Sequence, residues 1–342
     1  MVDWLNRLAH KSLLRLPPES AHEIGIAAMQ LRIGAPGRFI STEHSGTQTE
    51  LFGVKIDNPL GLAAGFDKNG LLADTAPDYG FGWIEIGSVT YCGGPGNSKP
   101  RLFRLREKRS LLNRMGLNGE PAASVAEKLA ELTAQNPTAP FAVNIAKTRD
   151  HKIIGDAATQ DILDSYNRLF RFGIYTAINI SCPNTEEGKT FEDNPHSLKE
   201  LLSETRKIGR TRPVLVKLSP NRTLTELEKI LEAAEPFVDG YVCGNTLPSA
   251  QMPEIFQRYG KGGISGELLR IHTLKLIENV RKLTRKPIIA CGGISSGEHM
   301  LAAYLAGANY FQAYTGFIYH GLRFAHDANT DFIRLLNKSR EN

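Results

Sequence analysis

The chain has 342 residues, of which 41% are hydrophobic and 23% charged, a composition typical of a folded protein that buries one large core or two modest ones. Global disorder is excluded, and because no apolar run approaches the roughly 18 to 20 residues of a membrane-spanning helix, neither a transmembrane helix nor secretion is expected. An excess of 41 Lys and Arg over 36 Asp and Glu gives a net charge of +5, which suits an anionic ligand or membrane surface but is too small to predict nucleic-acid binding.

The four cysteines of the chain do not have the spacing of a metal site. Cys92, Cys182, Cys243 and Cys291 stand far apart, so no pair forms the Cys-x-x-Cys pattern of zinc, iron–sulfur or redox dithiol sites. We therefore expect no metal, and free thiols in a reducing cytosol.

Residues 1–40 predict a helical hairpin. The first helix covers about residues 3–16 and ends at a Pro-Pro pair, and Ser20 and Glu23 have the spacing of a capping box for the second helix, which ends near Gly34. The second helix carries apolar residues on more than one face, with several cations nearby. Two interpretations are open: a helix packed on the following domain, or an interfacial anchor that rests on anionic lipid and admits an apolar substrate.

From about residue 60, short apolar runs alternate with helical patterns. The runs are mostly continuous, which is typical of parallel strands covered on both faces, and helical patterns such as 124–135, 224–234 and 267–282 lie between them. Eight such units predict a (β/α)8 TIM barrel, with a doubly wound sheet as the alternative. The runs are residues 60–64, 83–87, 141–145, 176–180, 214–218, 238–243, 288–291 and 309–313.

One interval breaks the rhythm of the units. Residues 88–140 separate the second and third runs, which is too long for a simple connection from a strand to a helix. The interval holds several Gly and Pro residues between 93 and 100, followed by Asn113 and Arg114. We expect it to form an arm folded over the mouth of the barrel.

Residues that follow the last two predicted strands suit a phosphorylated ligand. Gly292 and Gly293 follow the seventh run, and Tyr314-Thr315-Gly316 leads from the eighth run into a helix. Exposed backbone N–H groups and a helix N-terminus are what a phosphate group needs. A phosphorylated cofactor or substrate is therefore expected.

A lysine ends the fifth predicted strand, where an unpaired charge is costly. The ammonium of Lys217 needs an anionic partner, for which the N1–C2=O edge of a reduced flavin is one candidate and a carboxylate of the chain is another. Four asparagines also lie at strand ends, and their amides suit a small heterocycle with alternating C=O and N–H groups, although asparagine is also a common turn former. They are Asn113, Asn179, Asn184 and Asn245.

Seven motifs, in order along nearly the whole chain, resemble those of dihydroorotate dehydrogenase. The N-terminal hairpin, with Pro-Glu-Ser-Ala-His at 18–22, is similar to the class 2, quinone-dependent branch, because soluble class 1 enzymes lack such an extension. The motifs are Ala-Ala-Gly-Phe-Asp-Lys-Asn-Gly (63–70), Gly-Ser-Val-Thr (87–90), Lys-Pro-Arg-Leu-Phe-Arg (99–104), Asn-Arg-Met-Gly (113–116), Asn-Ile-Ser-Cys-Pro-Asn-Thr (179–185), Gly-Gly-Ile-Ser-Gly (262–266) and Cys-Gly-Gly-Ile (291–294).

The resemblance implies an FMN cofactor, dihydroorotate as substrate and a membrane quinone as electron acceptor. The FMN would be held by Ala64, Gly65, Thr90, Asn144, Asn179, Lys217, Gly244, Gly266, Gly293, Tyr314 and Thr315. The substrate would be held by Lys68, Asn113, Arg114, Met115, Gly116, Leu117, Asn179, Asn184, Asn245 and Thr246. A quinone channel between the N-terminal helices would be lined by His22, Arg104 and Tyr314.

The resemblance also assigns the catalytic base to Cys182. In the family, this base removes a proton from C5 of dihydroorotate while C6 gives a hydride to flavin N5, and the product, orotate, enters pyrimidine biosynthesis. The chain would then consist of residues 1–40, which reach the membrane and the quinone, and an FMN-binding barrel over 41–342. We expect peripheral attachment to anionic lipid at the inner face of the cell membrane, a monomer in preference to a dimer, and no nucleic-acid partner.

Three positions depart from the class 2 pattern. Cys182 stands where class 2 enzymes usually carry serine and is the residue that class 1 enzymes use. Residues 144–149 read Asn-Ile-Ala-Lys-Thr-Arg in place of Asn-Ile-Gly-Lys-Asn-Lys, and Gly244 replaces a threonine that contacts the flavin. Two alternatives therefore stay open: a diverged FMN oxidoreductase that acts on another small cyclic substrate, and a membrane-associated protein that keeps FMN without turnover.

Overall fold

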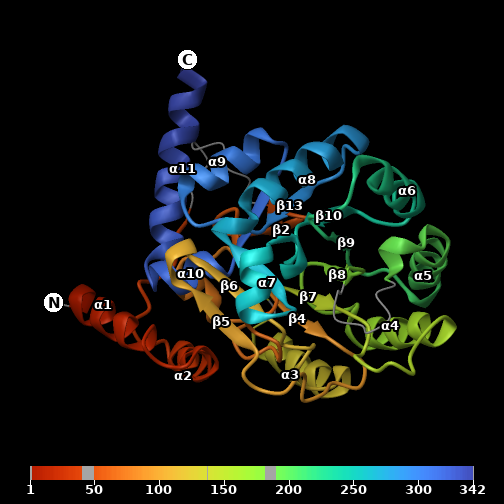
Figure 1. Cartoon of the computed structure of the whole chain (residues 1–342), viewed down its shortest axis with the longest axis horizontal. Helices are drawn as coiled ribbons and strands as arrows, with labels where there is room; N and C mark the ends of the chain where they lie inside the picture. The colour runs from red at the N-terminus through yellow and green to blue at the C-terminus, as the bar shows by residue number, and fades with distance from the viewer. Residues whose placement is uncertain (1, 41–49, 137, 182–189, 342) are drawn as a thin grey trace.

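A computed structural model describes residues 2–40, 50–136, 138–181 and 190–341 of the chain. Eight parallel strands close into a barrel with helices around it (Figure 1), so the (β/α)8 prediction is confirmed. Each predicted run overlaps one barrel strand, and only β4 extends beyond its predicted run. In order around the barrel, the strands are β3 (Leu60–Leu62), β4 (Trp83–Val89), β7 (Phe141–Ile145), β8 (Thr176–Asn179), β9 (Val214–Leu218), β10 (Gly240–Cys243), β13 (Ile288–Cys291) and β14 (Tyr310–Ala313), which pairs with β3.

Both faces of the barrel strands are covered, which explains why their sequences are apolar runs without alternation. On β4, Ile84 and Ile86 belong to the large core between the barrel and its helices, whereas Trp83 points inward and packs with Tyr310. A hairpin of β1 (Glu50–Leu51) and β2 (Val54–Lys55) adds the fully buried Leu51 to this inner core.

The outer helices follow their strands as predicted, except in the first unit, where a 3-10 helix (Ala76–Tyr79) takes the place of an α-helix. The predicted patterns at 124–135, 224–234 and 267–282 fall in α3, in α6, and in a 3-10 turn followed by α8. The outer helices are α3 (Ala122–Gln135), α4 (Asp156–Leu169), α5 (Pro195–Ile208), α6 (Leu224–Ala234), α8 (Arg270–Leu283), α9 (Gly297–Leu305) and α11 (Phe324–Glu341), with the short α7 (Pro253–Tyr259) and α10 (Thr315–His320).

The predicted arm is half of a second sheet. Its strands β5 (Leu102–Leu105) and β6 (Ser110–Asn113) join β11 (Leu247–Pro248) and β12 (Gly263–Gly266), which come from the connection after β10. The four strands are antiparallel in the order β11-β12-β6-β5, and Leu105, Leu112 and Ile264 form a small core beneath them.

The N-terminal hairpin forms, but its capping box does not. Helix α1 (Val2–Leu13) and helix α2 (Pro18–Gln30) follow each other along one edge of the molecule (Figure 1); His10 Nε2 of α1 lies 2.8 Å from the backbone oxygen of Ile318 in α10, and α2 packs beside β5. The capping-box prediction is wrong because α2 begins two residues before Ser20: Pro18 occupies the first helical position, where its missing N–H has no cost. Among the described residues, no helix is long and apolar enough to cross a membrane.

Candidate active site

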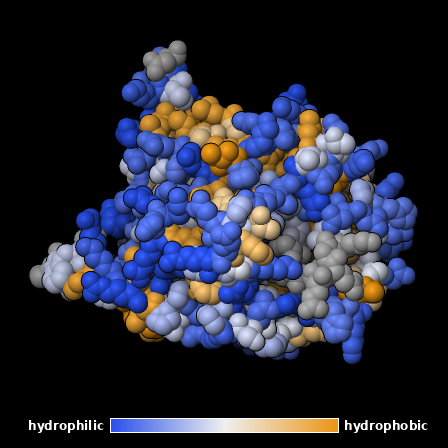
Figure 2. All heavy atoms as spheres, viewed as in Figure 1, coloured by the Kyte–Doolittle hydropathy of each residue, from blue (hydrophilic) through white to orange (hydrophobic). Residues whose placement is uncertain are grey.

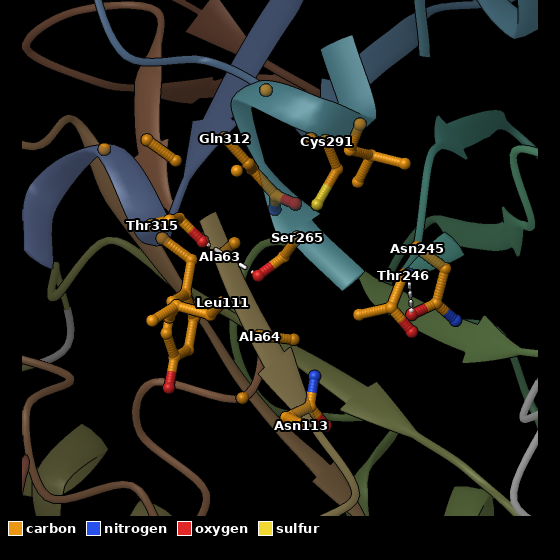
Figure 3. A pocket seen from close by; sticks show the side chains of 18 of the residues that line it. Ala63, Ala64, Leu111, Asn113, Asn245, Thr246, Ser265, Cys291, Gln312 and Thr315 are labelled. Atoms are coloured by element: carbon orange, nitrogen blue, oxygen red, sulfur yellow. Dashed lines mark hydrogen bonds between the residues drawn. The ribbon is translucent and has the colours of Figure 1, made fainter. Parts of the chain in front are cut away.

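A single cavity joins the residues at the carboxyl ends of the barrel strands to the second sheet above them (Figure 3). From the residues predicted to hold FMN, it is lined by Ala64, Gly65, Asn179, Lys217, Gly266, Gly293, Tyr314 and Thr315. From those predicted to hold substrate, it is lined by Lys68, Asn113, Met115, Gly116, Leu117, Asn179, Asn245 and Thr246. Two sets of residues from distant parts of the chain therefore meet in one site.

Some predicted residues lie elsewhere. Cys182 and Asn184 are outside the described residues. Thr90 is buried behind the cavity wall, where its backbone oxygen accepts from Ala122 N at 3.0 Å. Arg114 turns away from the cavity, and its Nη1 donates to the backbone oxygens of Tyr259 at 2.8 Å and Lys261 at 3.2 Å, which ties β6 to the segment after α7.

Gly244 is not on the cavity wall either. Its backbone has φ +123°, in the region that favours glycine, and a Cβ there would collide with the carbonyl oxygen of Cys291. Position 244 of this chain therefore requires glycine, and a threonine that reaches a ligand would not fit there.

The floor of the cavity carries a buried ion pair. Lys217 Nζ, at the end of β9, lies 3.2 Å from Oε1 of Glu85 on β4, and both side chains are almost completely buried. Asn144 Nδ2 donates to the same oxygen at 2.8 Å, and Ser88 Oγ donates to Asn144 Oδ1 at 2.5 Å. Asn144 thus lies beneath the cavity and supports it through Ser88 and Glu85. Of the two partners considered for Lys217 from the sequence, the carboxylate of the chain is the one present in the structure.

A chain of amides forms the side of the cavity next to β8 and β10. Asn245 Nδ2 donates to Asn179 Oδ1 at 3.2 Å and to Ser181 Oγ at 2.8 Å, and Asn179 Nδ2 donates to Ser88 Oγ at 3.3 Å. Across the cavity, Asn113 Nδ2 donates to the backbone oxygen of Gly263 at 3.3 Å. Because these bonds orient the amides, the side of the cavity offers both acceptors and donors at defined positions.

The opposite end of the cavity has the small residues that a phosphate group requires. Gly293 has φ +73°, and a Cβ there would lie 2.5 Å from Cα of Arg270, so this close approach of the two backbones requires glycine. Ser265 Oγ and Thr315 Oγ1 share a hydrogen bond of 2.9 Å (Figure 3), and Ser295 Oγ lies 3.0 Å from His299 Nδ1. Sequence reasoning missed Ser265, which lies inside the 262–266 motif, and Ser295, which directly follows the 291–294 motif.

The N-terminal hairpin reaches the cavity through aromatic contacts. The ring of His22 on α2 packs edge-on against Phe66 with 4.9 Å between centroids, and Phe66 packs against Tyr314 at 5.4 Å. Burial, aided by the charge of Lys68, lowers the pKa of His22 to about 4, so its imidazole is neutral at pH 7. Burial also lowers the pKa of the Lys68 ammonium. The side chain of Phe66 thus links two predicted channel residues, His22 and Tyr314.

The third predicted channel residue, Arg104, holds the end of α1. Its guanidinium donates to the backbone oxygens of Leu14 at 3.3 Å and Leu16 at 2.6 Å, and Arg106 Nη2 donates to Leu14 at 2.8 Å. The last carbonyls of a helix lack partners within it and favour a cation. Arg104 Nε is buried and has no hydrogen-bond partner among the described residues.

The low pKa of His22 predicts that docking of α2 weakens in acid. A histidine whose folded pKa is about 4, against 6.5 when exposed, takes up fewer protons folded than unfolded between these values. Its contribution to docking is therefore fully present above pH 6.5 and is lost as the pH falls toward 4. Hydrogen exchange of the α2 amides, corrected for intrinsic rates, should show lower protection at pH 5 than at pH 7.

A matched pair of variants isolates the effect of His22. His22→Gln should remove most of this pH dependence, whereas His196→Gln, which changes an exposed histidine of α5, should keep it. An equal fall in protection in wild type and His22→Gln would assign the effect to other groups.

Comparison with known proteins converges on one family. The model of the dihydroorotate dehydrogenase family matches residues 47–336. A dihydroorotate dehydrogenase (quinone) of Mycobacterium bovis is 36% identical and covers 96% of this chain and 94% of its own, and one of Natronomonas pharaonis is 33% identical and covers 98% and 95%. The crystal structure of DHODH from Eimeria tenella in complex with ferulenol superimposes with a TM-score of 0.84 at 27% identity, covering 94% of this chain and 92% of that one.

Proposed function

The chain belongs to the dihydroorotate dehydrogenase family, in its class 2, quinone-dependent branch, and on this premise we propose that FMN occupies the cavity and that the residues around it perform the reaction. The enzyme is an oxidoreductase that converts dihydroorotate to orotate in pyrimidine biosynthesis, with a quinone as electron acceptor. The observation that supports the proposed site best is the buried Lys217 ammonium at the floor of a cavity lined by amides and glycines.

A buried polar atom tests whether the cavity fits a flavin. Gln312, on β14, is fully buried and lines the cavity, and its Oε1 has no hydrogen-bond partner among the described residues. An unpaired buried acceptor is costly, and the N–H of a flavin pyrimidine ring is a donor that would satisfy it. Lys217 supplies the cation that the C2=O edge of the ring requires, and Gly293 with Thr315 supplies the phosphate end. The residues present therefore fit FMN.

FMN, when bound, supplies a two-electron acceptor for the substrate and a donor for the quinone. The residues of the chain have three tasks. Lys68 and the 113–117 segment would hold the substrate, and the amides of Asn179 and Asn245 would orient the substrate ring. Lys217 would stabilise negative charge on the reduced cofactor. Cys182 takes the proton from C5 of dihydroorotate.

Residues 1–40 provide the route for the quinone. Helix α2 is anchored by Glu19, whose Oε1 accepts from Arg101 Nε at 2.9 Å, and Arg101 Nη1 donates to the backbone oxygen of Pro95 at 2.5 Å. A quinone that enters between α1 and α2 would meet Arg104 Nε as a hydrogen-bond donor, and then His22 beside Phe66, which contacts Tyr314 of the cavity wall.

The outer faces of the two helices suit a lipid surface. Leu8 of α1 is 51% exposed, and Leu31, directly after α2, is 74% exposed. Figure 2 shows apolar side chains over these helices, among hydrophilic ones. Apolar side chains next to Lys11 and Arg15 are typical of a helix that rests on anionic lipid. We place the protein as a monomer at the inner face of the cell membrane, with 41–342 as its catalytic barrel.

Replacing Lys217 with alanine is expected to weaken FMN binding by tenfold or more, because a charge-assisted hydrogen bond contributes roughly 1.5 to 3 kcal/mol. FMN affinity is measured by quenching of flavin fluorescence on addition to the apoprotein. Lys207→Ala, at an exposed lysine of α5, is the matched control and should bind FMN like wild type.

The alanine also leaves Glu85 unpaired, and breaking a buried pair can cost about 3 to 5 kcal/mol of stability. Lys217→Ala combined with Glu85→Gln should recover that stability while FMN binding stays weak. A wild-type protein that takes up no FMN contradicts the proposed site.

A further inference from the structure

One buried carboxylate beneath the cavity has no direct role in the proposed reaction. Glu85 lies in the middle of β4, points into the barrel and is completely buried. Its Oε1 accepts from Asn144 at 2.8 Å and Lys217 at 3.2 Å, and its Oε2 accepts from Tyr175 Oη and Gln312 Nε2, both at 2.7 Å. Four donors from different parts of the barrel therefore converge on one side chain.

These contacts connect Glu85 to the floor of the cavity without exposing it there. Lys217 and Gln312 line the cavity, and Asn144 is bonded to Ser88, which also lines it. A buried ion pair is rarely more stabilising than apolar side chains of similar volume, so stability of the fold does not explain its presence. The position of Glu85 therefore indicates a role in setting the charge and the side-chain orientation that the cavity floor presents to a ligand.

The charges of the pair offset each other. Burial raises the pKa of Glu85, but Lys217 and the hydrogen bonds from Gln312 and Tyr175 outweigh it, and the resulting pKa lies below the ordinary value. Burial lowers the pKa of Lys217, whereas the neighbouring Cys291 and Glu85 raise it to above the ordinary value. The Glu85 carboxylate and the Lys217 ammonium are therefore both ionised at neutral pH. A ligand on the cavity floor meets the Lys217 cation, whose charge is partly offset by the carboxylate beneath it.

We propose that Glu85 is a positioning residue that sets the reduction potential of the bound flavin, by holding the Lys217 ammonium in place and offsetting part of its charge. The inference rests on the proposed FMN site. Reduction by dihydroorotate adds negative charge at the N1–C2=O edge of the flavin, where Lys217 attracts it. Without the carboxylate this attraction is stronger, and the reduced cofactor is bound more tightly relative to the oxidised one.

The test is the FMN midpoint potential at pH 6, measured by equilibration with reference dyes. Glu85→Gln keeps the size and one acceptor oxygen of the side chain, replaces the other oxygen with an NH2 donor, and removes the charge. The ratio of affinities for reduced and oxidised FMN should rise about tenfold, which is a positive shift of about 30 mV for a two-electron couple. An unchanged or more negative potential would overturn the proposal.

Two further variants separate charge from packing. Tyr175→Phe removes a hydrogen-bond donor to the same carboxylate without changing any charge, so the midpoint potential of this variant should equal that of wild type. A shift in Tyr175→Phe as large as that in Glu85→Gln would assign the effect to loosened packing instead. In a Lys217→Met background, Glu85 has lost its cation and should be protonated, so Glu85→Gln should no longer shift the potential. Retention of the full shift in that background would contradict an effect through Lys217.

Failure of the proposed role of Glu85 can be distinguished from failure of the proposed function. Failure of wild type to bind FMN overturns the cofactor assignment itself. If Glu85→Gln does not fold, Glu85→Asp, which keeps the charge but moves it away from Lys217, should shift the potential in the same direction, and a wild-type potential would overturn the role of Glu85.

Discussion

Cys182→Ala is expected to slow reduction of the bound flavin by dihydroorotate about 100-fold or more, the usual scale of a general base, while orotate still binds. The proton at C5 then has no acceptor, but the groups proposed to bind the substrate ring are intact. Stopped-flow absorbance of the flavin measures the rate, and orotate titration of the oxidised enzyme measures binding. Cys92→Ala changes an exposed free cysteine and should react like wild type.

The pH dependence of flavin reduction is a more specific test of the Cys182 thiol. A free thiol ionises near pH 8.5 and its thiolate accepts a proton directly, whereas a serine hydroxyl needs a relay. Flavin reduction in wild type should therefore rise with pH through a thiol-like pKa, and Cys182→Ser should retain part of the rate with its profile shifted to higher pH. Full speed and an unchanged profile in Cys182→Ala would mean that Cys182 only fills space.

Deletion of residues 1–40 should abolish most turnover with long-chain quinones and leave flavin reduction by dihydroorotate intact. The substrate half-reaction takes place at the barrel mouth, whereas the quinone is proposed to enter between α1 and α2. The truncated protein should also bind less to vesicles that contain anionic lipid. Undiminished long-chain quinone turnover would refute the channel.

A milder pair of variants guards against damage to the barrel, because Met29 of α2 is part of the main core. Leu8→Gln with Leu31→Gln removes exposed apolar side chains of the hairpin region. Ile271→Gln with Leu305→Gln removes side chains that are 72% and 69% exposed on the barrel helices. Only the first pair should weaken vesicle binding and raise the KM for long-chain quinones, and equal effects of both pairs would argue against a specific lipid face.

The barrel could be predicted because each strand is a local pattern. Eight continuous apolar runs separated by helical periodicity determine the unit count, and the carboxyl ends of parallel strands must meet at one mouth. From the sequence alone, this rule places Lys68, Asn179, Lys217 and Asn245 at that mouth. Element ends were less predictable: α2 begins at Pro18 because a proline favours the first helical position, a signal that competed with the Ser20–Glu23 spacing.

The second sheet could not be predicted in the same way. Its strands have two to four residues, and its central pairing joins Asn113 to Gly263, which are far apart in sequence. Such short strands carry too little periodicity to indicate pairing across that separation. The sequence therefore predicts an arm over the mouth but does not identify the partner of that arm.

Glu85 was missed although a signal was present. It interrupts the apolar run Trp83-Ile84-Glu85-Ile86, as Lys217 interrupts Val214–Leu218 and Gln312 interrupts Tyr310–Ala313. A charge within a strand that is buried on both faces requires a partner, so opposite charges in two such strands indicate an ion pair inside the barrel. Which strands face each other at the same height is a property of barrel closure and is not visible in one sequence.

The central claim is that this enzyme couples oxidation of dihydroorotate to reduction of a quinone through FMN. Steady-state turnover of the FMN-loaded, full-length protein with dihydroorotate, followed by the near-ultraviolet absorbance of orotate, tests it most directly. With a quinone as acceptor orotate should accumulate over many turnovers, and with fumarate or NAD+ in its place the reaction should stop after the bound flavin is reduced. Sustained turnover with fumarate or NAD+ but not with quinone, or no orotate with any acceptor, would contradict the account.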